Sequence, residues 1–259
     1  MIRKVIAGSM FAFLGLVCFV TPQAEKVSAE GNAIKEVMND AHKKGLLKEV
    51  LGGKANGESK NALLAQYVKL YEASCPGGDA NSWLNLTGTL AVAASKVVVG
   101  REGAVAELKA ASNCGACHKA HKGKGGAKKE EKKAEEKPAE KRRIKIDASH
   151  LLVAKKLSEA ATSAAKAKYS IKEVMKLAHK DGLLKKVNGG SASKEEKLKL
   201  LDLYLSMWAS EPSKGDINSW RKKVGDTVAA AAKVYLGQKD SIAQLKKASS
   251  CGGCHKPHK

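Results

Sequence analysis

The sequence repeats itself once, at a fixed interval of 137 residues. The interval relates pairs of identical residues, of several different types, over the whole length of the repeat. The matched pairs include Ile34 and Ile171, Met38 and Met175, His42 and His179, Trp83 and Trp220, and Gly100 and Gly237. A unit of this length is a whole domain, because the repeats of solenoid proteins are much shorter. We therefore predict two copies of one domain, with one compensating insertion and deletion between Tyr71 and Asp79.

Each copy carries the same short motif near its end. The motif is Cys-x-x-Cys-His, at residues 114–118 and again at 251–255. This motif is the attachment signature of a c-type haem. Two thiols three residues apart lie on one side of a helical turn and can form thioethers with the two haem vinyl groups, and the next residue offers an imidazole to the iron. The sequence therefore predicts two covalent haems. The attachment residues are Cys114, Cys117, His118, Cys251, Cys254 and His255.

Zinc binding and thiol redox chemistry are the other uses of such cysteines. Zinc needs four converging ligands, and Cys114, Cys117, His118 and His121 are a conceivable set. However, the adjacent Cys117 and His118 converge poorly on one tetrahedral ion when both lie on a helix. A thioredoxin-like site needs a βαβ setting, for which the sequence shows no pattern. Haem attachment is therefore the favoured interpretation.

The first 29 residues are typical of an export signal. A basic start precedes an apolar run over residues 5–20. This run is shorter than the ~20 residues that span a bilayer. We expect cleavage after Ala29, with Ala24 as the second candidate, and a periplasmic protein. Covalent haem attachment also requires export, so the two signals agree.

The chain is strongly basic, with a net charge of +21, but its basic residues are spread along the sequence and aromatic residues make up only 4%. Proteins that bind nucleic acids concentrate their basic residues and use aromatic side chains to stack bases. Nucleic acid is therefore not an expected partner. A lysine-rich surface instead favours acidic redox proteins as partners, with peripheral contact to an anionic membrane surface as a further option.

Apolar residues follow a helical spacing through each copy, and no strand pattern competes with it. In the first copy we expect four helices that end, in order, near Gly52, Pro76, Gly100 and His121. The fourth begins at about Ala104 and carries the motif and His121 on one face. Short loops between helices of this length favour antiparallel neighbours, as in an up-down-up-down bundle. The predicted fold class is all-α, with two tandem antiparallel four-helix bundles.

These patterns divide the chain into four segments. Residues 1–29 form the signal peptide, 30–121 the first bundle, 122–168 a linker and 169–259 the second bundle. The linker is rich in lysine and glutamate, and it has too little apolar area to offset its ordering entropy. We therefore expect a flexible, charged linker, in which residues 148–165 can form an extra helix. Each bundle is expected to fold without the other.

Three features of each copy coincide with those of a known family. The motif lies close to the end of the fourth helix, the first helix has an apolar residue that faces the haem, and a basic residue, Lys122 or Lys259, follows four positions after the motif histidine. In these features both copies resemble the class II cytochromes c, the cytochrome c′ family. The resemblance implies haem attachment through both cysteines and the motif histidine as proximal ligand. It also implies that Met38 and Met175 face the other side of the iron.

The residue on that distal side decides which function the resemblance implies. Family members with an aliphatic residue there are five-coordinate and bind small gases, whereas members with methionine are six-coordinate and look like electron carriers. Met38 shares a helical stripe with Ile34 and Ala41, and antiparallel packing brings this stripe beside the end of the fourth helix. His42 and His179, one turn further along, are the alternative ligands. Ordinary core packing is the alternative role of the methionines.

We therefore expect a periplasmic dihaem cytochrome that transfers electrons. No nucleophile with a base, no carboxylate pair and no phosphate loop accompanies the haem motifs, so an enzyme is not expected. The alternative function is that of a five-coordinate protein that binds NO or CO. The two are distinguished by the coordination state of the iron.

Some remaining residues also carry expectations. His121 and His258 follow each proximal histidine by one turn and are expected to be solvated or near the haem edge. Trp83 and Trp220 are expected to pack in the core or against the haem. Cys75 lies outside both motifs and aligns near Glu211 of the second copy, so it is expected to be a free thiol in a turn.

Overall fold

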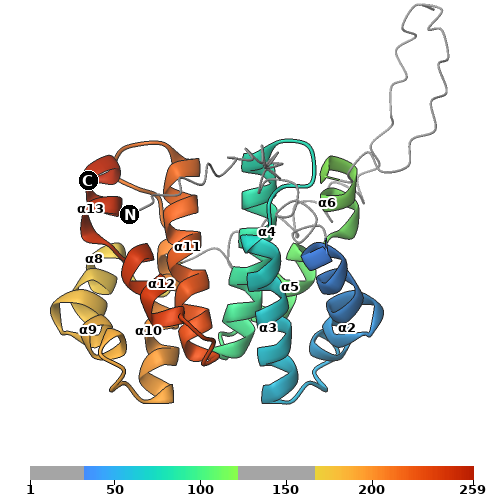
Figure 1. Ribbon diagram of the computed structural model, residues 1–259, viewed down its shortest axis with the longest axis horizontal. Coiled ribbons are helices and arrows are strands. Elements are labelled where there is room, and N and C mark those ends of the chain that lie inside the picture. The colour runs from blue at the N-terminus through green and yellow to red at the C-terminus, as the bar shows by residue number, and fades with distance from the viewer. Residues whose placement is uncertain (1–31, 122–166) are drawn as a thin grey trace, which may run out of the picture.

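The computed structural model describes residues 32–121 and 167–259 of the chain. Within these ranges the secondary structure is helical and contains no strand, which confirms the all-α fold class (Figure 1). No helix in the same ranges has both the length and the apolar character that crossing a membrane requires. The predicted signal peptide, nearly all of the predicted linker (122–168) and the suggested helix at 148–165 lie outside the described residues.

Each copy contains the same succession of helical elements. In the first copy, residues 32–37 are helical and continue into η1 (Met38–Lys43), which is followed by α2 (Leu46–Leu51), α3 (Gly57–Glu72), α4 (Ala80–Val98), α5 (Ala104–Ala111) and α6 (Cys114–His121). The second copy has α8 (Ile171–Val174), η2 (Met175–Lys180), α9 (Leu183–Asn188), α10 (Lys194–Trp208), α11 (Ile217–Tyr235), α12 (Ser241–Ala248) and α13 (Cys251–His258). Aspartates cap the starts of α4 and α11, where Asp79 and Asp216 accept backbone N–H bonds at 2.6 and 2.7 Å.

Two of the four helices predicted for each copy are broken, which corrects the sequence prediction. The first helix turns at Gly45 and Gly182, both with a φ of +83°, a left-handed conformation that suits glycine. The fourth helix is interrupted at Ser112 and Asn113. There Asn113 Oδ1 accepts a hydrogen bond from the backbone N–H of Ala116 at 3.2 Å and so begins a new helix. Each Cys-x-x-Cys-His motif therefore has a short helix of its own, α6 or α13.

The core lies where the two long helices of each copy pack together, α3 on α4 and α10 on α11. Its largest buried side chains occupy equivalent positions in the two copies. They are Leu63, Leu64, Tyr67 and Leu108 in the first copy, and Leu200, Leu201, Tyr204 and Leu245 in the second, each at most 1% exposed. Trp83 and Trp220 are buried as well, and each donates its indole N–H to a carbonyl oxygen. These contacts confirm a core role for both tryptophans.

The repeat runs without a gap through the turn between the two long helices. The two indoles bond to the carbonyl oxygens of Ala73 and Ser210, at 2.9 and 2.8 Å. Because these acceptors are also 137 residues apart, the insertion and deletion predicted in this turn is wrong. Cys75 therefore corresponds to Pro212, next to Glu211.

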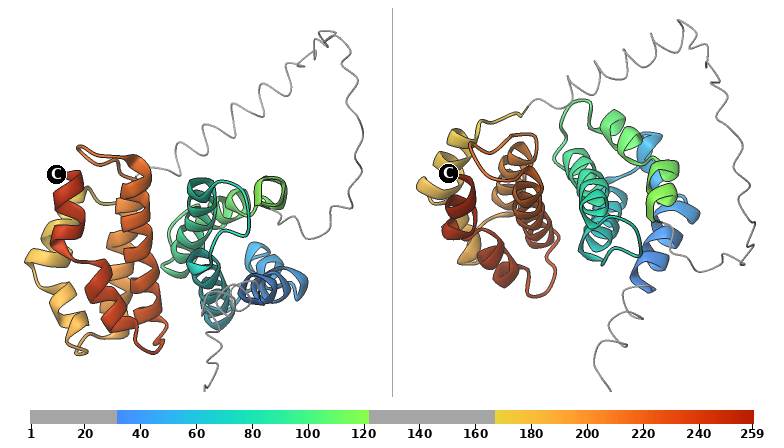
Figure 2. Two further views of the ribbon diagram at one scale, coloured as in Figure 1. Left: turned by 45° about the horizontal axis from the view of Figure 1, so that its top comes forward. Right: turned by 90° about the horizontal axis from the view of Figure 1, so that it is seen from above.

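The two copies lie side by side, with α4 against α11 (Figure 2). In addition, α3 contacts α11 and α10 contacts α4, so each long helix pair touches the other pair. The motif helices α6 and α13 lie at the same end of the molecule, on opposite outer flanks (Figure 1). The sequence does not predict this contact, since each bundle is expected to fold without the other.

Candidate functional site

The Cys-x-x-Cys-His motifs open the helices α6 and α13. The first cysteine of each motif is the first residue of its helix and is exposed, whereas the second, one turn later, is half-buried. These cysteines are Cys114 and Cys117 in α6, and Cys251 and Cys254 in α13; all four thiols are free. The motif histidines that follow are exposed. Both motifs are therefore helical, as predicted, with their thiols one turn apart.

A cavity of about 240 Å³ lies against α6 in the first copy. Its lining consists of Met38, His42, Lys43, Leu70, Leu86, Thr87, Leu90, Ala111, Ser112, Asn113, Cys114, Cys117 and His118. The cavity thus brings together both motif thiols, the motif histidine and both candidate distal ligands of this copy. Leucines of α3 and α4 make much of the remaining wall apolar. Attachment residues, axial ligands and an apolar wall are what a buried haem requires.

The second copy has a hollow that reaches the equivalent motif. It is lined by His179, Leu184, Lys185, Asn188, Gly189, Lys246 and Cys251. This hollow joins His179 with the first motif cysteine, but its lining does not include Met175. Met175 is half-buried and packs against the core. The structure therefore unites all predicted ligands of the first copy and only some of those of the second.

The candidate distal ligands all lie on π-helical turns. These ligands are Met38 and His42 on η1, and Met175 and His179 on η2. A π-turn holds one extra residue, which shows in the hydrogen bond from the Lys44 N–H to the Asn39 oxygen at 2.9 Å. Such turns often occur at functional sites. The sequence shows no sign of these π-turns, because the apolar stripe of this helix continues across the turn without a break.

Both candidate histidine ligands have a pKa below the ordinary value, which favours the neutral imidazole. Burial lowers the pKa of His42, and the positive charge of the nearby motif histidine lowers it further. The same two causes lower the pKa of His179 in the second copy. A neutral imidazole can offer a ring nitrogen to a metal. The two rings lie 6.0 and 6.1 Å, between centroids, from the rings of Tyr67 and Tyr204.

Tyr67 and Tyr204 are buried, and their hydroxyl groups have no hydrogen-bond partner in the part of the chain that the structure describes. Buried polar groups without a partner are rare in proteins. Burial raises the pKa of both phenols, and the charge of neighbouring motif cysteines raises it further, so both hydroxyls are protonated donors. Neither tyrosine is among the residues that line the cavity or the hollow, although each ring lies beside a histidine that does. The sequence signal for these tyrosines is a hydroxyl at the same position of both copies.

The histidine that follows each motif is buried, so the prediction that His121 and His258 are solvated is wrong. Their nearness to a haem edge stays a prediction. His121 Nδ1 lies 2.8 Å from the Gly77 oxygen, and Nε2 lies 3.1 Å from Ser82 Oγ. Its ring meets that of Trp83 edge-on at 5.4 Å. His258 makes the equivalent polar contacts at 3.4 Å each. These histidines fasten the motif helix to the turn between the two long helices.

Glycine allows this turn to approach the motif helix closely. Gly78 has a φ of +82°, and a Cβ added there would lie 2.4 Å from the Ala120 oxygen. Gly215 occupies the equivalent place in the second copy, where a Cβ would lie 2.4 Å from the Pro257 oxygen. A larger residue at either position would push the turn away from α6 or α13.

The zinc alternative loses one of its four ligands. Both ring nitrogens of His121 contact other groups, Gly77 and Ser82, and this residue does not line the cavity. Among residues 32–121 and 167–259, no three or more histidine, cysteine, aspartate or glutamate side chains are grouped to hold a metal ion. A haem iron takes its equatorial ligands from the porphyrin, so this finding does not bear on haem.

No protein-family model matches the chain, and neither a curated protein nor a solved structure matches it. The resemblance to the class II cytochromes c therefore rests on the residues and the geometry described above.

Proposed function

We propose that the chain is a periplasmic dihaem c-type cytochrome that transfers electrons, with one covalent haem in each of two tandem four-helix bundles. The observation that carries the proposal is the lining of the cavity in the first copy. It includes Cys114, Cys117, His118, Met38 and His42. These residues come from opposite ends of the copy and meet at one cavity. Such convergence supports a common ligand more strongly than the motif does alone.

The residues of the site divide the work of holding a haem. In the first copy, both motif cysteines attach it, His118 provides the proximal ligand and Met38 the distal ligand. The corresponding residues of the second copy are Cys251, Cys254, His255 and Met175. When bound, a haem supplies a reversible one-electron couple at its iron. Methionine opposite histidine favours a high reduction potential.

The remaining cavity residues set the surroundings of the iron. Leu70, Leu86 and Leu90 exclude water from the cavity, which lowers the local dielectric and so strengthens electrostatic interactions there. Tyr67 lies behind this wall, where its buried ring packs beside His42 at 6.0 Å between centroids. No residue of the chain is assigned a catalytic role, because electron transfer requires only ligation, burial and charge.

The setting of the proposed function follows from the export signal and the net charge of +21. Export places the protein in the periplasm, where covalent haem attachment takes place. A lysine-rich surface attracts and orients acidic partners during diffusional encounter. We therefore propose acidic redox proteins as partners, with peripheral contact to an anionic membrane surface and without nucleic acid.

A five-coordinate site that binds NO or CO is the second candidate. It is favoured by the free space of the cavity beside Met38 and His42. The side chain of Met38 separates the two candidates, because ligation by methionine closes the distal side. The gas-binding function therefore requires that Met38 only packs against the core.

Absorption spectra of the mature protein, oxidised and reduced, with and without CO, test the proposal. We expect low-spin haems, a weak long-wavelength charge-transfer band in the oxidised protein, and no uptake of CO. Met38→Ala should remove one haem's share of the band and open that haem to CO. His42→Ala, on the same π-turn, is the matched control and should leave the band unchanged.

The other outcomes of this experiment are equally informative. If the haems of the unaltered protein are high-spin and take up CO, gas binding replaces electron transfer as the proposed function. Low-spin haems without the charge-transfer band would identify His42 and His179 as the distal ligands. The absence of haem absorption would refute the proposed function as a whole.

A further inference from the structure

The contact between the two copies is centred on two equivalent contacts, each between an aromatic side chain and a glycine. Trp208 of α10 packs on Gly88 of α4, where an added Cβ would lie 2.4 Å from the indole ring. Tyr71 of α3 packs on Gly225 of α11, where an added Cβ would lie 2.4 Å from the phenol oxygen. The interval of 137 residues relates the two aromatic side chains to each other, and likewise the two glycines. The same contact therefore occurs twice, as in the isologous interface of a homodimer.

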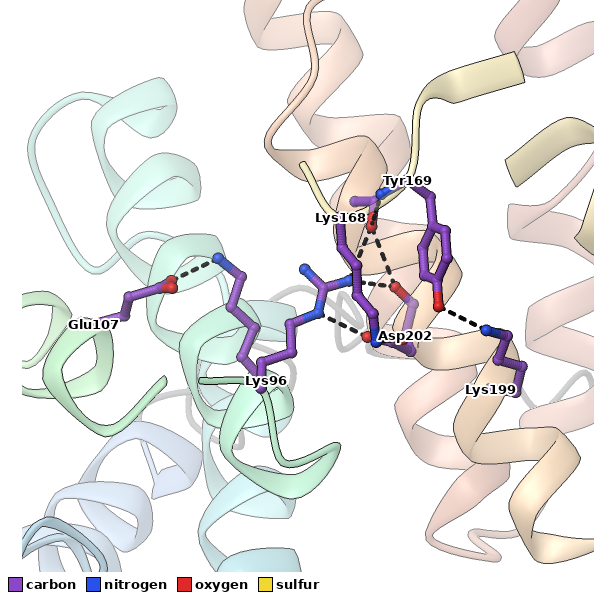
Figure 3. Close-up of polar contacts among 8 residues, drawn as sticks. Lys96, Glu107, Lys168, Tyr169, Lys199 and Asp202 are labelled. Carbon is purple, nitrogen blue, oxygen red and sulfur yellow. Dashed lines mark hydrogen bonds and ion pairs between the residues drawn. The ribbon is translucent and has the colours of Figure 1, made fainter. Parts of the chain in front are cut away.

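The main ion pair across this interface, in contrast, occurs once. Arg101 Nε donates to Asp202 Oδ1 at 2.7 Å, and Arg101 Nη2 donates to the Asp202 carbonyl oxygen at 2.6 Å and to Ser206 Oγ at 2.9 Å. Figure 3 shows Asp202 and the hydrogen bonds and ion pairs that meet at its side chain. The two charged side chains are 10% and 8% exposed. The repeat places Gln238 at the position of Arg101 and Ala65 at that of Asp202, so the pair has no counterpart.

Two further polar contacts across the interface are also one-sided. Tyr71 donates its hydroxyl hydrogen to Asp226 Oδ1 at 3.0 Å, and Lys233 Nζ lies 2.8 Å from Glu72 Oε1. The repeat replaces Asp226 by Thr89, and Glu72 by Ala209. Neither replacement carries a negative charge. The polar residues therefore distinguish two faces that the aromatic contacts leave alike.

A pair formed by two identical copies would keep the glycine surfaces and lose the ion pair. In a pair of first copies, Arg101 would face Ala65, and in a pair of second copies, Asp202 would face Gln238. A pair of first copies would therefore hold Arg101 at two places without an opposite charge. In a pair of second copies, Asp202 would keep Lys168 of its own copy, at 2.9 Å, but would lose its bond from Arg101. There Lys233 would face Ala209 in place of Glu72, again at two places. Burying an unpaired charge is strongly unfavourable. Proteins use this kind of mismatch to reject wrong partners.

We propose that this interface is specific for the unlike copy: it joins residues 32–121 to residues 167–259 and rejects self-association of either. The partner of each face is then the other copy of the same chain, which the covalent connection keeps at a high effective concentration. The result is a monomeric protein in which the two motif helices keep a fixed relation. This inference does not depend on haem binding and goes beyond the proposed function.

The test uses the full chain with a specific protease site inserted within residues 122–166 and cut after purification. Size-exclusion chromatography and native mass spectrometry then show which fragments stay together. We expect a one-to-one pair of unlike fragments and no self-pairs. Fragments that separate at micromolar concentration, or a statistical mixture of self-pairs and unlike pairs, would overturn the proposal.

A substitution taken from the other copy sharpens the test. Asp202→Ala leaves Arg101 buried without its partner, and we expect the Kd of the cut pair to rise about a hundredfold or more. Lys186→Ala is the matched control, because it removes an ion pair of 2.6 Å with Glu196 inside the second copy. This control should leave the Kd unchanged. Equal Kd values for the two variants would overturn the proposal.

Circular dichroism shows whether Asp202→Ala folds. If it does not fold, a double variant tests the proposal in its place. Arg101→Gln combined with Asp202→Ala removes both charges and gives both faces the residues of the repeat counterpart. We then expect self-pairs to appear beside the unlike pair after cleavage. Their continued absence would show that the ion pair does not reject self-association, and the proposal would fall.

Discussion

Replacing His121 by alanine should loosen the motif helix from the rest of the first copy. His121 is 3% exposed and joins α6 to the turn between α3 and α4. Alanine removes its polar contacts with Gly77 and Ser82, at 2.8 and 3.1 Å, and its edge-on contact with Trp83. Each hydrogen bond contributes about 1 kcal/mol and a ring contact of this kind about 0.5–1.5 kcal/mol. We therefore expect the free energy of unfolding to fall by about 3 kcal/mol.

The second copy provides an internal comparison for this variant. His258 makes the equivalent polar contacts at 3.4 Å each, near the limit of hydrogen-bond geometry. His258→Ala should therefore cost about half as much as His121→Ala, roughly 1.5 kcal/mol. Lys119→Ala, at an exposed position of α6, is the control and should change the free energy by less than about 0.5 kcal/mol.

Urea unfolding, followed by tryptophan fluorescence and far-ultraviolet circular dichroism, measures these changes. The haem-loaded protein is used for all variants, so that haem content is held constant. A loss at His121 no larger than the loss at Lys119 would refute the anchoring role. A larger loss of unfolding free energy in His258→Ala than in His121→Ala would refute the expectation that the shorter contacts contribute more.

Three other perturbations test separate parts of the account. Gly88→Ala should destabilise the contact between copies by about 1–3 kcal/mol, because its Cβ would meet the Trp208 ring at 2.4 Å. Gly57→Ala, where an added Cβ meets nothing within 4 Å, should have little effect in the same urea assay. Tyr67→Phe should leave the stability of the haem-loaded protein unchanged or raise it, because it removes a buried hydroxyl that has no partner among the described residues; a loss of about 1 kcal/mol would show that a bound group accepts a hydrogen bond from this hydroxyl. The interface should also respond to acid: burial alone would raise the pKa of Asp202, but hydrogen bonds from Lys168 and Arg101 outweigh it and lower the pKa. A lowered pKa means that the stabilisation is complete above the unfolded-state value of about 3.9 and is lost as the pH falls through the folded-state value. The cut pair should therefore hold together between pH 7 and 5 and dissociate below about pH 4 in size-exclusion runs; dissociation between pH 7 and 5 would contradict this assignment.

The features that depend on local spacing are readable in the sequence. Apolar residues at helical intervals predict the long helices, and Leu63, Leu64 and Leu108 are indeed buried. The motif at residues 114–118 lies on a helix, as the thiol spacing predicts. The lining of the cavity agrees with the expectation that Met38 lies near the motif. Whether Met38 ligates iron stays a prediction.

Other features depend on contacts between distant segments, and the sequence carries little sign of them. The π-turns arise inside a continuous apolar stripe, so no residue pattern predicts them. His121 looks like a solvated residue, because a histidine among lysines near a helix end is usually exposed, and its partners lie in a turn far back in the chain. The interface pairs Tyr71 with Gly225. Periodicity marks such positions as apolar without saying which surface covers them.

The central claim is that each Cys-x-x-Cys-His motif holds its own covalent haem. Acid–acetone extraction removes haem that is bound without a covalent link, so a mass spectrum of the extracted, exported protein measures the claim directly. We expect two haem additions to the polypeptide mass, and one addition after Cys114→Ser combined with Cys117→Ser. A polypeptide mass without any haem addition would contradict the account.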